Sequence, residues 1–548
     1  MFTRIKRSGK YEYLQICESK REGKRIKQRV VSTIGRMDRL KEKGTIEQLV
    51  RSLAKYSEKV MLVLSGKSDP KASVKKIGPS LIFERLWEET GIRSIIENLV
   101  DRRKYSFSVE RAIFLTVFHR LLKSGSDRDC IRWQRDYNLI GMDSLHLQHF
   151  YRAMAWIGEE LDDQKDATPF SPRCTKDLIE EELFLHRRDL FSSLDLVFFD
   201  TTTIYFEGNG GQTIGKRGNN KDHRPDLKQM VVGVIIDNYG QPICCEMWPG
   251  NTTDVKTLIP IVDKLRKRFS ISSVCVVADR GMISKETIKA LSDKNRNIPY
   301  ILGARMRKVK EIKEIIESHI DIDAFTEVYP ESRLSKAPAP LKVSEVKVAG
   351  RRYILCYNSR EARKDAADRK AILESLKEKV KKNPGSLIGN KGYRKYLKID
   401  TGTVKVDDNK IESSAKFDGL WVLQTNKEWS AEQVALKYKQ LWQIEYLFRD
   451  LKSILQTRPV FHKCDETIRG HVFCSFLALV LRKELQRRLE KKGYYFEWSN
   501  IKQDLKSLQE TIIHENGETL AIRSECQGVC GKVFNAVGVA IPPTIREL

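Results

Sequence analysis

Long apolar segments are absent from this sequence of 548 residues. The longest run, FCSFLALVL at 473–481, is shorter than the roughly 20 residues that a bilayer-spanning helix requires. The first residues, MFTRIKRSGKYEYLQI, contain no apolar core of the length found in signal peptides. We therefore expect a cytoplasmic protein without a membrane partner.

Clustered cysteines are also missing. The eleven cysteines show no repeated spacing, and Cys526 and Cys530 form an isolated CxxxC pair. A structural zinc site requires four ligands, usually in paired clusters. His462 and Cys464 are possible ligands, but no second pair stands near them in the sequence. Reduced and mostly buried thiols are expected, which again fits the cytosol.

Acidic residues are outnumbered along the whole chain. Lysine and arginine together number 99 against 73 aspartates and glutamates, which gives a net charge of +26. This excess favours a polyanionic partner, with nucleic acid as the first candidate, although a soluble basic protein of another kind would share it. The length of the chain favours several domains.

The first 160 residues divide into a strand-rich and a helical part. Residues 11–35 are typical of two strands around a charged turn, and a basic helical stretch follows. Residues 66–76 have the composition of a linker. From 77 to 160 apolar residues recur at spacings of three and four residues, which predicts helices, and basic residues lie on or between them. Such a bundle is either a DNA-binding domain or a scaffold with a solvated charged face.

The central part predicts a mixed sheet. Strands are expected at 194–206, 229–237, 242–247 and 273–278, and the first three are close enough in sequence to be antiparallel neighbours. Residues 300–430 alternate charged helices with strand-like runs, which indicates an inserted module.

Three acidic residues occupy unusual positions. Asp200 interrupts the apolar strand LDLVFFDTTTIYF, and Asp279 ends the strand-like VVAD before Gly281. Glu445 lies on a predicted long helix, 431–456. The apolar seam expected along that helix consists of Leu441, Ile444, Phe448, Leu451 and Leu455.

Glu445 is one heptad from Tyr438 and from Lys452. Positions one heptad apart share a helix face and drift by only about 20°. The pattern thus predicts that Glu445 flanks the seam, near the buried side.

Divalent cations would explain all three carboxylates. A carboxylate in an apolar setting needs a partner, and Mg²⁺ prefers carboxylate oxygens. Two such ions about 4 Å apart activate an attacking oxygen and stabilise a leaving one in phosphodiester chemistry. Ordinary roles remain open for each residue alone, since Asp200 has Thr202 nearby, Asp279 precedes a turn, and Glu445 has Arg449 four residues on.

Four stretches together resemble bacterial insertion-sequence transposases of the DDE type. They are LVFFDTTTIYFEG, PGNTTDVKTL at 249–258, VVADRGMIS and YKQLWQIEYLFRDLK. The last is similar to the signature Tyr-x2-Arg-x3-Glu-x6-Lys, which Tyr438, Glu445 and Lys452 match. Leu441 stands where the signature has arginine, and Arg449 or Lys439 is a possible substitute.

The resemblance implies an α/β protein with an RNase H-like catalytic core, interrupted by a strand-containing insertion and preceded by a β-hairpin module and a helical domain. The expected domains are 1–75 (hairpin and basic helix), 76–190 (helical, binding DNA ends), 191–299 (first part of the core), 300–430 (α/β insertion), 431–495 (second part of the core) and 496–548 (C-terminal helical extension).

The resemblance also implies the chemistry. Asp200, Asp279 and Glu445 would be the catalytic ligands of two Mg²⁺ ions, or of Mn²⁺ in their place. Water would cut a phosphodiester at the end of the element, and the resulting 3′-hydroxyl would attack target DNA. Tyr438, Lys452 and Arg449 would contact phosphates of the DNA.

The implied partners are double-stranded DNA, as terminal inverted repeats and as target, and a second copy of the chain in a homodimer. The protein would then lie on the bacterial nucleoid when bound. Two other functions remain open: a metal-dependent nuclease or resolvase of the same fold without strand transfer, and an inactive DNA-binding derivative.

Overall fold

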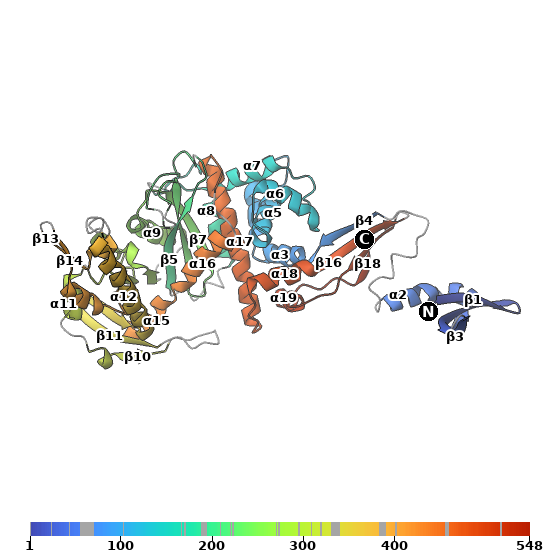
Figure 1. Ribbon diagram of the computed structural model, residues 1–548. Coiled ribbons are helices and arrows are strands. Elements are labelled where there is room, and N and C mark those ends of the chain that lie inside the picture. Colours follow the sequence, from blue (N-terminus) through green and yellow to red (C-terminus); the bar gives the residue numbers. More distant parts are fainter. Residues whose placement is uncertain are drawn as a thin grey trace. The chain divides into compact units, whose positions relative to one another are not determined.

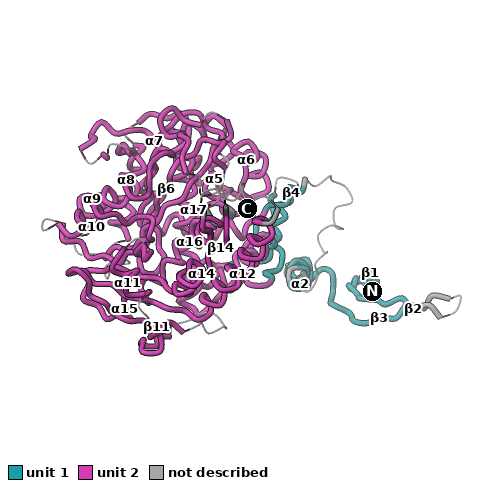
Figure 2. Tube along the Cα trace, turned by 60° about the vertical axis from the view of Figure 1, so that its left-hand side comes forward, with its two compact units in different colours: residues 1–75, 507–527, 541–548 teal, residues 76–506, 528–540 magenta. Residues whose placement is uncertain are grey.

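The computed structural model describes most of the chain and divides it into two compact units. Residues outside the description are 1, 23–24, 43, 55–70, 102, 166, 169–170, 188–193, 195, 209, 220, 222–223, 270, 272–274, 294–295, 308, 318–320, 330–339, 383–390, 401–402, 455–459 and 516–517. Unit 1 contains residues 1–75, 507–527 and 541–548, and unit 2 contains 76–506 and 528–540 (Figure 2).

Unit 1 begins with an antiparallel sheet. The predicted hairpin is confirmed as β2 (Tyr11–Glu22) and β3 (Arg25–Arg36), and β1 (Phe2–Ser8) pairs with the outer edge of β2. Helices α1 (Met37–Glu42) and α2 (Thr45–Ala54) follow. The basic helical stretch is therefore confirmed as far as Ala54.

A second sheet in unit 1 corrects two expectations. Its strand order is β18–β17–β16–β4. The end of the expected linker is a strand, β4 (Lys71–Lys76), while 66–70 lie outside the described residues. The C-terminal segment, expected to be helical, contains α18 (Trp498–Ser507) and α19 (Cys530–Val537) but also β16 (Gln509–Glu515), β17 (Glu518–Arg523) and β18 (Ile545–Glu547). The β-branched residues in TII and TLAI favour these strands.

The helical prediction for 77–160 is confirmed in unit 2. The helices are α3 (Gly78–Glu89), α4 (Ile92–Val100), α5 (Val109–Leu122), α6 (Asp127–Trp133) and α7 (Leu147–Gly158), followed by α8 (Thr175–His186). Every residue of α5 is buried.

A close helix pair fixes this bundle to the rest of unit 2. Helix α7 packs against α17 (Asp465–Lys491), the long helix of Figure 1. A Cβ atom added at Gly158 would lie 1.9 Å from the carbonyl oxygen of Glu466, and one at Gly470 would lie 1.9 Å from that of Met154. Glycine is thus required on both helices for this approach.

Nine of the described strands form the main sheet, in the order β10–β11–β12–β15–β9–β8–β5–β6–β7. The five strands at one end of this order are β5 (Leu196–Tyr205), β6 (Gln229–Asp237), β7 (Pro242–Pro249), β8 (Cys275–Ala278) and β9 (Tyr300–Ala304). The antiparallel β5–β6–β7 arrangement confirms the prediction, while β8 runs parallel to β5 and β9 parallel to β8.

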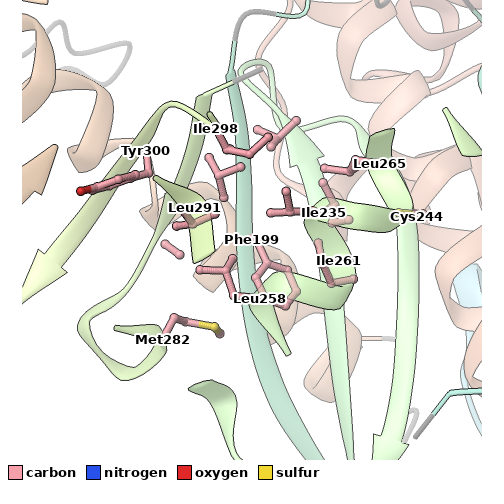
Figure 3. Packing of buried hydrophobic residues seen from close by; sticks show 14 of the residues in the cluster. Phe199, Ile235, Cys244, Leu258, Ile261, Leu265, Met282, Leu291, Ile298 and Tyr300 are labelled. Carbon is pink, nitrogen blue, oxygen red and sulfur yellow. The ribbon is translucent and has the colours of Figure 1, made fainter. Parts of the chain in front are cut away.

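An apolar core covers one face of these five strands. Helix α9 (Leu258–Arg268) contributes Leu258, Ile261 and Leu265, which pack with Phe199 of β5 and Ile235 of β6 (Figure 3). Helix α10 (Lys285–Leu291) adds its last residue to the same cluster. Because side chains alternate along a strand, Asp200 points to the sheet face opposite Phe199.

The region 300–430 continues the same sheet. Its strands are β9, β10 (Thr326–Val328), β11 (Leu341–Val348), β12 (Arg351–Tyr357) and β15 (Leu420–Thr425), and β15 pairs with β9. Helices α11 (Lys310–Glu317), α12 (Ser359–Lys382), α13 (Lys391–Arg394) and α14 (Asp408–Ala415) accompany them, with the hairpin β13 (Leu397–Asp400) and β14 (Thr403–Val406).

The single long helix predicted at 431–456 is wrong. The segment forms α15 (Ala431–Lys439), α16 (Trp442–Arg449) and a π-helical turn at Asp450–Ile454. Between the two α-helices, the N–H of Leu441 donates to the carbonyl of Tyr438, three residues back. Such tight 3₁₀ bonds end the regular α-helix.

The apolar seam of this segment is confirmed at Leu441, Ile444, Phe448 and Leu451, which are buried, while Leu455 lies outside the described residues. The predicted position of Glu445 is wrong, because its side chain is exposed. Leu447 completes the buried face of α16, and Glu445 is rotated about 100° from Ile444.

Most cysteines are buried and all described ones are free thiols, as expected; Cys464 is exposed and Cys526 is intermediate. In the described part of the chain, no helix combines the length and apolar character needed to cross a membrane.

Candidate active site

The structure brings Asp200 and Asp279 together. Strands β5 and β8 are parallel neighbours, and Phe199 pairs with Ala278 in their register. The next residues along both strands are Asp200 and Asp279. The two carboxylates therefore project from adjacent positions, at the point where β8 ends and β5 continues.

The charge of Asp200 is poorly compensated. Burial raises the pKa of this carboxyl to about 6, and the nearby carboxylates of Asp279 and Asp254 raise it as well. The Lys221 ammonium and the backbone N–H of Thr201, 2.7 Å from Oδ1, act in the opposite direction without cancelling the effect of burial. A group of this kind gains from a nearby positive charge.

Asp254 is a third carboxylate of this site, and its role was not predicted. It opens a 3₁₀ turn, Asp254–Lys256, in the loop after β7. The Thr201 hydroxyl donates to Asp254 Oδ1 at 2.6 Å. The stretch PGNTTDVKTL contains Asp254, so the signal was present in the sequence, but a loop aspartate gave no reason to place it beside β5.

Lys221 forms ion pairs with two of these carboxylates, and it was not predicted from the sequence. Its Nζ lies 3.5 Å from Asp254 Oδ2 and 3.9 Å from Asp200 Oδ1, and it donates to the carbonyl of Thr201 at 2.6 Å. A single lysine in a loop gives no sequence signal that distinguishes it from the other basic residues of this chain.

Tyr438 contacts the second aspartate. Its hydroxyl donates to Asp279 Oδ1 at 3.2 Å. Burial raises the pKa of Tyr438, and Asp279 adds to that effect, so the phenol remains protonated and able to donate. A Cβ atom at residue 303 would lie 2.5 Å from the Tyr438 hydroxyl, so Gly303 of β9 makes room for it. In this structure the hydroxyl expected to contact DNA is directed at a carboxylate.

The other predicted residues lie on α16 and the turn after it. Helix α16 packs against β5, the strand of Asp200. Within the described contacts, no hydrogen bond or ion pair links Glu445 to Asp200 or Asp279. Arg449 is exposed, with its guanidinium 4.9 Å from the ring centre of Tyr446. Lys452 belongs to the π-helical turn and is half-buried.

A basic groove adjoins Asp279. It has a volume of about 440 Å³ and lies against Tyr438 and the residues that follow each of the two parallel strands β8 and β9. Its lining includes Arg280, Arg305, Arg307 and Trp421. Three arginines thus line a groove that also contains Tyr438, the hydrogen-bond donor to Asp279, and guanidinium groups of this kind suit phosphates.

A separate acidic cluster lies deep in unit 2 and contains none of the predicted ligands. Asp177, Glu180 and Glu246 have carboxylate oxygens within 4.8 Å of one another, a spacing that would suit a metal ion. Lys264 forms ion pairs with all three, at 2.9 Å from Asp177, at 3.3 Å from Glu180, and with Glu246. Because a buried ammonium already occupies the centre, this cluster is an ion-pair network.

Comparison with known proteins agrees with the resemblance seen in the sequence. The family model for the transposase DDE domain matches residues 192–481, more than half of the chain. The chain belongs to the DDE transposase family, and it is an enzyme of DNA transposition. A second model, the N-terminal domain of IS1634 family transposases, matches residues 2–67.

No curated protein matches the sequence. Among solved structures, the cryo-EM structure of the piggyBac transposase synaptic complex with hairpin DNA is similar at a TM-score of 0.35 and 12% identity, covering 78% of this chain and 79% of that chain.

Proposed function

We propose that this transposase cuts DNA at the ends of an insertion element and joins the free 3′ ends to target DNA, with Asp200, Asp279 and Glu445 as ligands of two Mg²⁺ or Mn²⁺ ions. The observation that carries the proposal is the side-by-side placement of Asp200 and Asp279 on parallel strands.

The side chains present fit a divalent cation. Carboxylate oxygens are the ligands that Mg²⁺ prefers. The pKa of Asp200, raised to about 6 mainly by burial, reflects a carboxylate whose burial the nearby Lys221 ammonium does not offset. When bound, the ions would activate the attacking oxygen and stabilise the leaving one. Tyr438 would hold the Asp279 carboxylate in a fixed orientation through its hydrogen bond.

Glu445 is assigned the third ligand position on two grounds. Helix α16 packs against β5, the strand of Asp200. Asp200 points away from the apolar core formed with α9, and no residue of α16 belongs to that core among the described residues. The α-helix is interrupted on both sides of α16, by the 3₁₀ bonds after α15 and by the π-helical turn at Asp450–Ile454. Local adjustment of α16 would therefore not require the whole segment to move.

The catalytic core is proposed to be RNase H-like. The order β7–β6–β5–β8–β9 consists of three antiparallel strands followed by two parallel ones, with helices in the connections after β7 and β8. The strands β10, β11, β12 and β15 would then extend this core from the insertion between Asp279 and Glu445.

Double-stranded DNA is the proposed partner, and the ends are proposed to be paired by a homodimer. The groove with Arg280, Arg305 and Arg307 supports phosphate binding next to the carboxylates. Lys452 and Arg449 are proposed as further phosphate contacts, and residues 1–190 as the part that recognises the terminal repeats.

The test uses the DNA that flanks the coding sequence. A labelled duplex carrying either flank is incubated with the full-length protein, Mg²⁺ and a supercoiled target plasmid. Cleavage at the flank and covalent joining of the label to the plasmid are expected. Cleavage without joining would favour the nuclease or resolvase alternative, and binding without cleavage would favour the inactive derivative.

A further inference from the structure

We propose that Lys221 is a built-in counter-cation that competes with the divalent metal for Asp200, and that Asp254 is the positioning residue that anchors Lys221. This inference rests on the proposed metal-dependent function. It names two residues that would set the Mg²⁺ concentration at which the enzyme is half-saturated.

The first support is the position of the ammonium group. Lys221 Nζ lies between two carboxylates, nearer to Asp254, at 3.5 Å, than to Asp200, at 3.9 Å. It also donates to the carbonyl of Thr201 at 2.6 Å and to the Thr201 hydroxyl at 3.1 Å. The same lysine supplies the ion pair that opposes the effect of burial on Asp200. An ammonium and a metal ion at these oxygens repel each other, so occupancy by one opposes the other.

The second support is the way that the loop of Lys221 is fixed. Its backbone N–H donates to the Thr203 hydroxyl at 3.0 Å. The threonines of β5 thus bind Lys221 at both its backbone and its ammonium group. These contacts account for three residues of the run DTTT: Asp200 provides the carboxylate, and Thr201 and Thr203 hold the lysine beside it.

The third support is the position of Asp254, which lies between Thr201 of β5 and Gly281 in the turn after β8. Thr201 Oγ1 donates to Asp254 Oδ1 at 2.6 Å, and a Cβ atom added at Gly281 would lie 3.5 Å from Asp254 Oδ2. Thr201 alternates with Asp200 along β5, so Asp254 meets the sheet on the α9 side and reaches Asp200 through Lys221 and Thr201. This arrangement suits an anchor better than a direct metal ligand.

These contacts predict opposite effects for the two residues. Lys221→Met removes the competing charge, so the half-saturating Mg²⁺ concentration should fall, by roughly fivefold for one partly exposed ion pair. Asp254→Asn removes the anchor and lets the ammonium turn fully to Asp200, so that concentration should rise by a similar factor. If Asp254 acts through Lys221, the double variant behaves like Lys221→Met alone.

The experiment measures metal binding as well as activity. Mn²⁺ binding to the full-length protein is titrated by calorimetry, and cleavage is measured across a Mg²⁺ series to separate the maximal rate from half-saturation. Lys216→Met and Asp226→Asn are matched controls, because both residues are exposed and lie outside the site. Thermal midpoints of all variants report folding, and Asp254→Glu should restore the wild-type metal response.

The outcomes separate this inference from the proposed function. If Asp200→Ala abolishes metal binding while Lys221→Met leaves half-saturation unchanged, the competition is overturned and the metal site stands. If Asp254→Asn weakens metal binding further in the Lys221→Met background, Asp254 is a ligand and its anchoring role is overturned. If Asp200→Ala leaves metal binding intact, the proposed metal site itself fails.

Discussion

Two clusters of three carboxylates lie in the described part of unit 2, and one member of each, Asp177 and Asp200, has its pKa shifted in the opposite direction to the other. In the cluster of Asp177, Glu180 and Glu246, burial disfavours the charged form, but Lys176, Lys264 and Arg268 outweigh it and hold the pKa of Asp177 well below its usual range. In the cluster of Asp200, Asp254 and Asp279, burial dominates and the pKa of Asp200 rises to about 6.

The difference lies in the cations that each fold provides. The first cluster is enclosed: Lys176 and Lys264 are nearly inaccessible, and the carboxylates also accept bonds from Ser171 and from the N–H of Cys245. In the second, the cation that the described ion pairs place on Asp200 and Asp254 is Lys221, with a side chain that is 38% exposed. Close carboxylates therefore do not by themselves indicate a metal site; a deficit of positive charge beside them does.

The largest expected effect comes from removing the proposed ligands. Asp200→Ala, Asp279→Ala and Glu445→Gln should each lower cleavage about a thousandfold or more, because each would remove an oxygen that is proposed to hold an ion at the reacting phosphate. DNA binding, measured by gel shift in Ca²⁺, should persist. Asp226→Asn serves as the control. Near-normal cleavage by any one of the three would end its assignment as a ligand.

Breaking the ion-pair network should affect stability instead. Lys264→Met leaves three buried carboxylates with too little positive charge, which should cost about 3–5 kcal/mol of folding free energy. Chemical denaturation would measure the loss, and Mn²⁺ calorimetry would measure the number of sites. An added high-affinity site in the variant is compatible with the network; loss of a site present in the wild type would show that the network itself binds metal.

The site was predicted from charged residues that stand in apolar segments of the sequence. Asp200 was detectable because it interrupts an apolar strand, and the strand pattern around it gave β5, β6, β7 and β8 nearly to the residue. The break before α16 was not detectable, because the apolar seam continues across Leu441 as it would in an unbroken helix. Because Tyr438 and Glu445 lie on different helices, their heptad spacing does not place them on one helix face.

The pairing of strands that are far apart in the sequence could not be predicted either. Strand β15 pairs with β9, more than a hundred residues earlier, and nothing in either apolar segment specifies the other as its neighbour. Lys221 and Asp254 lie in loops whose positions depend on Thr201 and Thr203. Such loop residues have no periodicity from which a contact can be inferred.

The raised pKa of Asp200 predicts how pH changes the stability of the metal-free protein. The folded-state value of about 6 exceeds the ordinary 3.8, so the charged carboxylate destabilises the folded state, fully above pH 6 and progressively less as pH falls toward 4. Asp200→Asn should therefore raise the thermal midpoint of chelator-treated protein at pH 7.5, and by less at pH 5. An equal gain at both pH values would contradict the assigned charge penalty.

The smallest expected effect concerns Lys452, the proposed phosphate contact on the turn after α16. Lys452→Ala should weaken binding to the element end severalfold and reduce the slope of log K against log salt by about one, since one fewer counterion is released. Lys452→Arg keeps the charge and should preserve the slope. An unchanged slope for Lys452→Ala would mean that this lysine only supports the fold around α16. The proposed access of DNA to the site of Asp200 and Asp279, in contrast to the enclosed cluster, would then depend on Arg280, Arg305 and Arg307 of the groove.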